Sequence, residues 1–194
     1  LPRWLDIGNL LASNRVRVPQ VLASDATAGF ALLEDLGGPT LAQTINDDTA
    51  DAGIDAAIDQ LLRLQQLTPT SGLPRFDQAL LHRDAGLFEQ WFIGTHLGLQ
   101  LDCGQVEQLQ LVQHRLMDNA LAQAQLPVHR DFMPRNLMPV ADGLAVLDFQ
   151  DLVIGPVAYD VASLLRDAFL SWPEERVAQW VAHYHARALA AGIP

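Results

Sequence analysis

The chain has 194 residues, nearly half of them apolar, which is enough for one domain with a substantial core. Its net charge of −11 argues against nucleic acid or an anionic membrane surface as a partner, because both attract basic faces. No apolar run approaches the roughly 20 residues that span a bilayer. The single cysteine, Cys103, excludes an internal disulfide and fits a reducing cytoplasm, where we expect the protein.

The first forty residues predict a small front with few strands. Residues 3–13 carry apolar side chains at helical spacing, and Asn14 is a typical C-terminal stop. Residues 16–23, which contain a proline, form at best an edge strand, and residues 29–34 form a better one. The second strand runs into Gly37-Gly38-Pro39, which must turn and is the only convincing lobe boundary.

The rest of the chain is mostly helical. Periodicity and stop signals predict helices over residues 51–66, 76–97, 105–124, 159–172 and 174–191. The side chains expected on their core faces include Ile54, Ile58, Leu61, Leu62, Leu80, Leu81, Leu87, Phe88, Trp91, Phe92, Val106, Leu109, Val112, Leu116, Leu121, Val161, Leu164, Leu165, Ala168, Phe169, Val177, Trp180, Val181 and Tyr184. We therefore predict an α+β fold weighted towards helix.

The most informative stretch lies between the third and fourth of these helices. It contains His129, Asp131 and Asn136 in the spacing H-x-D-x-x-x-x-N, and Asp148 follows twelve residues after Asn136. Two short apolar runs joined by Ala141-Asp142-Gly143 predict a hairpin between them. A hairpin returns the chain to its starting point, so it brings the three polar side chains together. This layout is typical of phosphoryl transfer from ATP, in which one carboxylate orients the acceptor hydroxyl while an amide and a second carboxylate bind Mg²⁺.

A second His-Arg-Asp tripeptide, residues 82–84, tests how specific that pattern is. Five residues after Asp84 the chain has Glu89 instead of Asn, and a helical pattern follows in place of a hairpin. We interpret residues 82–84 as a solvated helix face.

The usual means of gripping ATP phosphates is missing. All twelve basic residues are Arg, and no G-x-G-x-x-G occurs, whereas kinases use a Lys and a Gly-rich loop for this purpose. Because the first residue is Leu1, we expect the chain to be a piece of a longer protein. Glu34, Asp35 and Leu36 lie where a kinase hinge offers its backbone to adenine, although an ordinary strand-to-helix loop explains these residues alone equally well.

Four segments together resemble the aminoglycoside phosphotransferase and choline kinase superfamily: LLEDLGG (32–38), VHRDFMPRN (128–136), VLDFQD (146–151) and GPVAYDVASLLRD (155–167). Within it, the chain is most similar to bacterial kinases that phosphorylate the anomeric hydroxyl of N-acetylmuramate and N-acetylglucosamine in cell-wall recycling. The resemblance implies a protein-kinase-like fold, with residues 1–36 as a remnant of the N-lobe and hinge and residues 37–194 as the helical C-lobe. It also implies ATP and Mg²⁺ as cofactors and a small sugar as substrate.

The pattern and the resemblance assign roles to individual residues. Asp131 is the expected catalytic base, and Asn136 and Asp148 are the expected metal ligands. The remaining assignments are His129 and Asp160 as structural supports of the loop, Arg135 as a possible phosphate ligand, and Asp151 as a possible contact to substrate or a second metal. Only six residues separate Asp148 from Gly155, too few for an activation loop, so we expect no regulation by phosphorylation there.

Two alternatives remain open. The acceptor of the phosphoryl group is an aminoglycoside, choline or homoserine in other members of this superfamily, and the acidic composition suits a polycationic acceptor. If the chain were complete, the absence of Lys would instead favour a catalytically inactive nucleotide-binding module. Nothing in the sequence specifies an oligomeric state.

Overall fold

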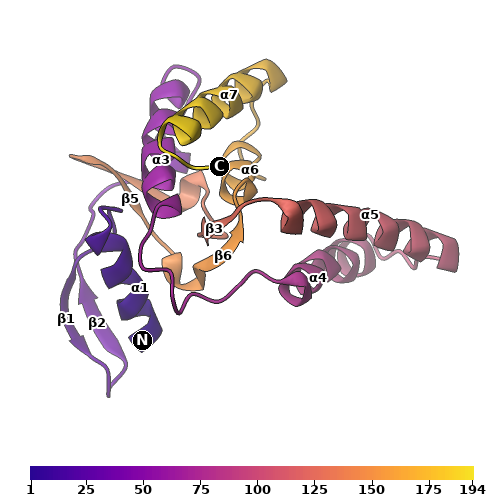
Figure 1. The fold of residues 1–194 in the computed structure, drawn as a ribbon, viewed down its shortest axis with the longest axis horizontal. Helices are drawn as coiled ribbons and strands as arrows, with labels where there is room; N and C mark the ends of the chain where they lie inside the picture. The colour runs from indigo at the N-terminus through magenta and orange to yellow at the C-terminus, as the bar shows by residue number, and fades with distance from the viewer.

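The computed structural model describes residues 1–194 as a compact body with one protruding arm (Figure 1). The helices are α1 (Pro2–Ser13), α2 (Leu41–Thr44), α3 (Ala50–Gln65), α4 (Gln78–Leu87), α5 (Cys103–Ala122), α6 (Tyr159–Leu165) and α7 (Glu174–Ala190). The strands are β1 (Val21–Asp25), β2 (Phe30–Leu33), β3 (Gln125–Val128), β4 (Leu137–Val140), β5 (Gly143–Val146) and β6 (Val153–Pro156). None of the helices is long and apolar enough to cross a bilayer.

The N-terminal part of the molecule consists of α1 and the antiparallel pair β1–β2, at the lower left of Figure 1. Helix α1 ends where predicted, because the Asn14 side chain donates to the Leu10 carbonyl at 2.9 Å. The first strand begins later than expected, at Val21 instead of residue 16, and all five of its residues are exposed. Nothing in these 194 residues adds a third strand to this pair.

Helix α3 is the centre of the core. The four side chains predicted to face inward, Ile54, Ile58, Leu61 and Leu62, are all buried. Its acidic residues stay largely exposed to solvent and also pair with arginines of α7: Asp51 pairs with Arg176, and Asp55 and Asp59 both pair with Arg187. The α3–α7 interface therefore combines an apolar seam, which includes Trp180 and Tyr184, with a charged margin.

The predicted hairpin is present as β4–β5. Val140 pairs with Gly143, so Ala141 and Asp142 form the turn. A second antiparallel pair, β3–β6, lies at the two ends of this region, with Gln125 opposite Pro156 and Val128 opposite Val153. The stretch of residues 129–152 therefore begins and ends on one two-stranded ladder.

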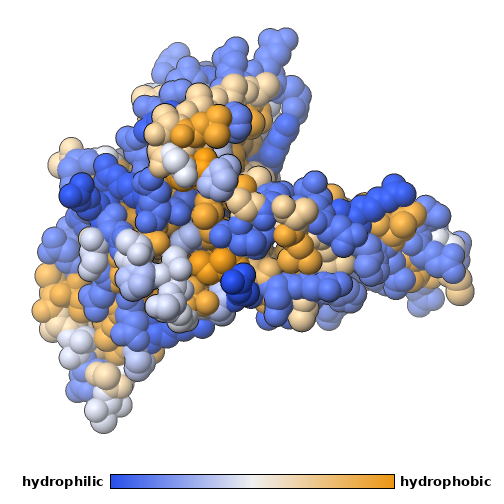
Figure 2. Space-filling model, in the orientation of Figure 1, coloured by the Kyte–Doolittle hydropathy of each residue, from blue (hydrophilic) through white to orange (hydrophobic).

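The arm consists of α4, the π-helical turns Phe88–His96 and α5, and it extends away from the body (Figure 1). The sequence predicts two continuous amphipathic helices with buried apolar faces, and this is wrong for much of the arm. Apolar side chains are visible among hydrophilic ones on its surface (Figure 2). The side chains predicted to be inward but found exposed are Leu87, Phe88, Trp91, Phe92, Val112, Leu116 and Leu121.

Helix α6 is shorter than predicted and ends at Leu165 instead of residue 172. The Asp167 carboxylate accepts hydrogen bonds from the backbone N–H groups of Phe169 and Leu170, at 2.6 and 3.2 Å. Such local side-chain bonds compete with helix formation. As a result Phe169, predicted to lie in the core, is 73% exposed. In α7, Val181 is also exposed, contrary to prediction.

Candidate active site

The loop that follows β3 is held in place by hydrogen bonds to a side chain of α6. Asp160, in the first turn of α6, is fully buried, and its two oxygens accept the backbone N–H groups of His129 and Arg130 at 2.7 and 3.0 Å. Burial raises the pKa of Asp160 to about 7, against the two donors, which lower it. Asp160 therefore sets the orientation of two consecutive peptide groups immediately before Asp131.

His129 is buried within this loop. Its Nδ1 accepts the N–H of Asp131 at 3.3 Å, and its Nε2 lies 2.9 Å from the carbonyl oxygen of Leu147. Burial lowers its pKa to about 4, so the imidazole is neutral near pH 7 and donates from Nε2. A neutral ring in this tautomer connects the loop to the end of β5.

Asn136 connects the same two segments. Its side-chain Nδ2 donates to the backbone carbonyl of Asp131 at 2.9 Å, and its own carbonyl accepts the N–H of Leu147 at 2.9 Å. The amide nitrogen is thus used within the protein, which leaves Oδ1 available to a ligand. The β4–β5 hairpin returns the chain to within one hydrogen bond of Asn136, as the sequence predicts.

Asp148 directly follows Leu147 and has a left-handed backbone, with φ of 58°. Its carboxylate is accessible, and Oδ1 accepts a hydrogen bond of 2.6 Å from Gln150 Nε2. The neighbouring Phe149 is buried, with its ring centroid 5.0 Å from that of Trp4 on α1. The backbone turn therefore separates a buried ring from an exposed carboxylate. Asp151 is also exposed.

The negative charge of Asp148 influences the pKa of Asp131. Its pKa is raised, first by partial burial and then by the negative charge of Asp148, while Arg130 and Arg135 oppose the rise. A carboxylate with a raised pKa is a better proton acceptor. The structure thus gathers Asp131, Asn136 and Asp148 as expected, although no cluster of three or more His, Cys, Asp or Glu at ligating distance occurs in the chain.

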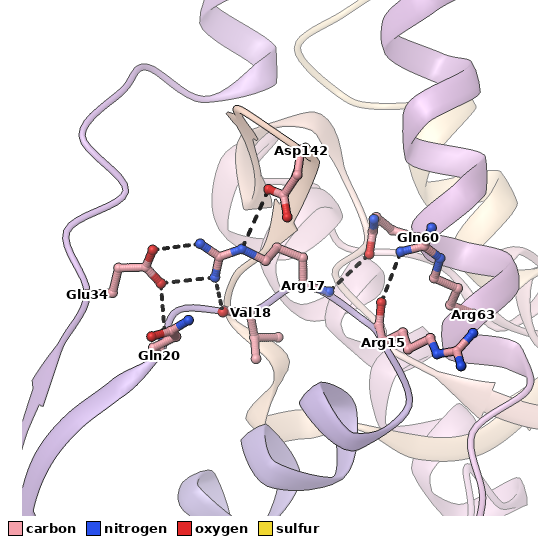
Figure 3. A network of polar contacts seen from close by, with 8 residues as sticks. All are labelled: Arg15, Arg17, Val18, Gln20, Glu34, Gln60, Arg63 and Asp142. Atoms are coloured by element: carbon pink, nitrogen blue, oxygen red, sulfur yellow. Dashed lines mark hydrogen bonds and ion pairs between the residues drawn. The ribbon is translucent and has the colours of Figure 1, made fainter.

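Glu34 lies at the end of β2, and its side chain is engaged within the protein. Both carboxylate oxygens bind the Arg17 guanidinium, at 2.6 and 2.9 Å, and one also accepts the N–H of Gln20 (Figure 3). Arg17 Nε lies 3.9 Å from Asp142 in the β4–β5 turn, so Arg17 links the end of β2 to the hairpin (Figure 3). Arg17 was missed in the sequence, because it lies outside every recognisable motif.

The backbone of the predicted hinge is free. The Glu34 carbonyl and the Leu36 N–H have no hydrogen-bond partner within the chain, and Asp35 uses its side chain to accept the N–H of Gly37 at 2.8 Å. One carbonyl and one N–H spaced in this way suit the edge of an adenine ring. The contact available at Glu34 is therefore its backbone and not its carboxylate.

Arg135 points towards neighbouring side chains. Its Nε donates to the sulfur of Met133 at 2.8 Å, and its guanidinium lies 5.0 Å from the ring centroid of Phe169. The residue is exposed, so its charge stays accessible from solvent.

A residue outside the predicted set also contacts the loop. Arg130 Nη2 forms an ion pair of 2.8 Å with Asp84 Oδ2, from the second His-Arg-Asp tripeptide. The interpretation of residues 82–84 as a solvated face is correct for His82 and Arg83, which are exposed, and wrong for Asp84. A carboxylate in the middle of a helix gives no signal of such a distant partner.

A model of the phosphotransferase enzyme family matches residues 1–193, almost the entire chain. The chain belongs to this family. Two relatives are described as N-acetylmuramate/N-acetylglucosamine kinases: that of Pseudomonas putida is 49% identical and that of Pseudomonas aeruginosa 41% identical, each over 98% of this chain. The chain spans 56% of the length of both relatives.

Solved structures show the same fold at low identity. An aminoglycoside phosphotransferase, APH(2'')-Ib with bound ADP, matches 99% of this chain and 68% of its own with a TM-score of 0.66 and 18% identity. The choline kinase LicA from Streptococcus pneumoniae matches 94% of this chain and 61% of its own with a TM-score of 0.65 and 14% identity. The fold is therefore the α+β kinase-like fold that the sequence predicts.

Proposed function

We propose that the protein is a Mg-ATP-dependent kinase that phosphorylates a hydroxyl of a small sugar, the anomeric hydroxyl of N-acetylmuramate or N-acetylglucosamine. The observation that carries this is the hydrogen bond from Asn136 to the backbone of Asp131. It joins residues 129–136, the proposed catalytic loop, to the β4–β5 hairpin, and Asp148 follows shortly after that hairpin. Relatives with amino-sugar kinase names support the choice of substrate.

Asp131 is the proposed catalytic residue. It accepts the proton of the sugar hydroxyl and orients that oxygen towards the phosphoryl group. Because the transition state of phosphoryl transfer is loose, orientation contributes more than early proton transfer. The fixed peptides at His129 and Arg130 and the raised pKa of Asp131 both favour this role.

Two side chains fit a magnesium ion. Asn136 offers its Oδ1, because Nδ2 is already bonded within the loop, and Asp148 offers an accessible carboxylate oxygen. Oxygen donors in this number suit Mg²⁺, which takes few protein ligands and completes its shell with phosphate and water. When bound, the ion neutralises charge on the phosphates. Asp151 lies three residues further on and remains a candidate for a second metal or for substrate.

ATP binding is assigned to two places. The free backbone groups of Glu34 and Leu36 receive adenine, with Asp35 between them, and Arg135 is a candidate for a phosphate contact. We assign residues 1–36 to a remnant of the N-lobe and hinge and residues 37–194 to the helical C-lobe, so both lobes would contribute to ATP binding. We place the protein in the cytoplasm, where ATP and a reducing environment for Cys103 are both found.

The test is ADP release from Mg-ATP by the longest form of the protein that carries this chain. N-acetylmuramate, N-acetylglucosamine, kanamycin and choline are offered separately, with Asp148→Asn to remove the metal carboxylate. The matched control is Asp118→Asn, which makes the same change at an exposed position of α5.

We expect turnover with an amino sugar that is lost in Asp148→Asn and kept in Asp118→Asn. Turnover only with kanamycin or choline would preserve the chemistry but refute the amino-sugar assignment. Binding of ATP without turnover on any acceptor would refute the kinase and favour a nucleotide-binding module.

A further inference from the structure

Arg130 directs its side chain out of the catalytic loop and towards the arm. Its guanidinium lies 5.2 Å from the ring centroid of Phe76 and forms the 2.8 Å ion pair with Asp84. The two partners are mostly shielded from solvent, with side-chain exposures of 18% and 23%. Shielding strengthens such a pair, and it raises the penalty for removing one partner alone.

The Asp84 carboxylate is divided between two arginines. Oδ2 faces Arg130, whereas Oδ1 accepts Nε and Nη2 of Arg83 at 3.1 and 3.0 Å. Arg83 is 65% exposed, so its contribution is screened by water. Asp84 is the only carboxylate paired with Arg130, whose Nε is buried without a hydrogen-bond partner.

The position of Asp84 is fixed relative to the loop. Phe76 N–H donates to the carbonyl of Ile154 and Ile154 N–H to that of Pro74, both at 2.8 Å, so the start of α4 is attached to β6. The Asp77 side chain caps α4 by accepting the N–H of Leu80 at 2.9 Å. Helix α4, which carries Asp84, is therefore anchored to the β3–β6 ladder, from which the loop also starts.

The loop needs such support at this residue. Arg130 has a left-handed backbone, with φ of 79°, which is strained for a residue with a side chain. Asp160 binds its N–H from one side, and Asp84 binds its guanidinium from the other. The peptide that follows is that of Asp131, so both contacts restrain the backbone immediately before the proposed catalytic carboxylate.

We propose that Asp84 is a positioning residue for catalysis, which acts through Arg130 to keep Asp131 oriented towards the acceptor hydroxyl. In many protein kinases a phosphorylated activation loop supplies an anion to arginine, and this orders the loop only after modification. Here the six residues between Asp148 and Gly155 leave no room for such a loop, and a helical carboxylate supplies the anion permanently. This inference rests on the proposed kinase function.

The kinetic test compares Asp84→Asn, Arg130→Gln, the double variant and the control Arg83→Gln. Displacement of a catalytic group by about 1 Å costs up to about 100-fold in rate, so we expect each of the first two to lower kcat about 10- to 100-fold. The KM for ATP is expected to change less, by about twofold, because the hinge is untouched. The double variant is expected to be no slower than Asp84→Asn, because the two residues act as a unit.

Asp84→Glu separates positioning from folding. It keeps the anion on the same helix, so it is expected to recover most of the kcat lost in Asp84→Asn. Wild-type kcat in Asp84→Asn, or fully multiplicative losses in the double variant, would overturn the proposal. Equal losses in Asp84→Glu and Asp84→Asn would also overturn it.

A readout that needs no activity keeps this test independent of the proposed function. Amide hydrogen exchange is measured by mass spectrometry over residues 129–136, in wild type, Asp84→Asn and Arg83→Gln. We expect faster exchange in Asp84→Asn alone. If the wild type lacks kinase activity, the proposed function fails while this measurement still decides whether Asp84 orders the loop. Unchanged exchange in Asp84→Asn would refute the inference.

Discussion

The two His-Arg-Asp tripeptides of this chain have the same residues in different surroundings. In residues 129–131 the histidine is fully buried and the arginine backbone is left-handed. In residues 82–84 the tripeptide lies inside the regular helix α4, and His82 and Arg83 face solvent. The tripeptide therefore indicates no chemistry by itself. Its meaning comes from the Asn five residues after Asp131 and from the hairpin that returns to it.

The comparison also shows a connection between the two regions. The arginine of the first tripeptide pairs with the aspartate of the second, so the helical copy supports the loop copy. One copy is thus assigned to chemistry and the other to positioning. Substitutions in the two tripeptides should separate these roles.

Asp131→Asn is expected to lower kcat by about 10²- to 10⁴-fold, the usual contribution of a positioned acid or base. ATP binding should be nearly unchanged, because Asp131 is assigned to the sugar hydroxyl. Steady-state ADP release gives the first quantity, and ATP titration by calorimetry gives the second. Asp84→Asn, in the other tripeptide, is the matched comparison and should have the smaller effect on kcat. Wild-type turnover in Asp131→Asn would refute its assignment.

Asp160→Ala is expected to destabilise the protein by about 2–6 kcal/mol, because two N–H donors, one buried and one partly buried, lose their acceptor at about 1–3 kcal/mol each. The donors are those of His129 and Arg130. Urea denaturation measures the loss in the free energy of unfolding. Asp77→Ala, which removes only an exposed helix cap, serves as the control, with an expected loss of about 1 kcal/mol. Equal losses in the two variants would contradict the role given to Asp160.

His129 should make stability depend on pH, because its pKa is lowered on folding. The unfolded chain protonates His129 below its ordinary pKa of 6.5, but the folded protein does so only near pH 4. The free energy of unfolding contributed by His129 therefore rises between pH 4 and 6.5. The folded and unfolded pKa values differ by about 2.5, which at about 1.4 kcal/mol per pH unit corresponds to about 3 kcal/mol.

The raised pKa of Asp160 acts in the opposite direction across this whole range, because the unfolded chain loses that proton near pH 3.8 whereas the folded protein keeps it up to about pH 7. The measurement is therefore a difference: unfolding of wild type and of His129→Gln at several pH values. That difference should grow with pH from 4 to 6.5. A flat profile for His129→Gln would mean that the folded histidine is not buried in its neutral form.

Arg83→Gln is expected to have the smallest effect. Its guanidinium is 65% exposed, and exposed pairs contribute about 0–1 kcal/mol. Thermal unfolding should therefore change little, and kcat should stay near that of wild type. A loss of kcat as large as that of Asp84→Asn would shift the positioning role from Arg130 to Arg83.

Local signals in the sequence predict part of this structure well. The hairpin β4–β5, the stop at Asn14 and the buried face of α3 are determined by nearby residues: turn chemistry, a side-chain cap and a 3.6-residue period. The chemistry-bearing residues Asp131, Asn136 and Asp148 are likewise separated by short chain distances, so their proximity follows from one hairpin.

The remaining features depend on distant partners. Periodicity predicts an apolar face on α5 but not what covers it, so the exposure of Val112 and Leu116 was not predictable. The pairing of Asp84 with Arg130 spans 46 residues, and Glu34 pairs with Arg17, which lies outside any motif. The early end of α6 results from a local competitor, Asp167, whose effect is visible only after the backbone is known.

We propose that only the tripeptide at residues 129–131 takes part in phosphoryl transfer. The most direct measurement is mass spectrometry of the product formed from N-acetylmuramate and Mg-ATP, by wild type, Asp131→Asn and Asp84→Asn at equal concentrations. We predict a sugar phosphate from wild type, a slower yield of the same product from Asp84→Asn, and almost none from Asp131→Asn. Product from Asp131→Asn at the wild-type rate would contradict the account.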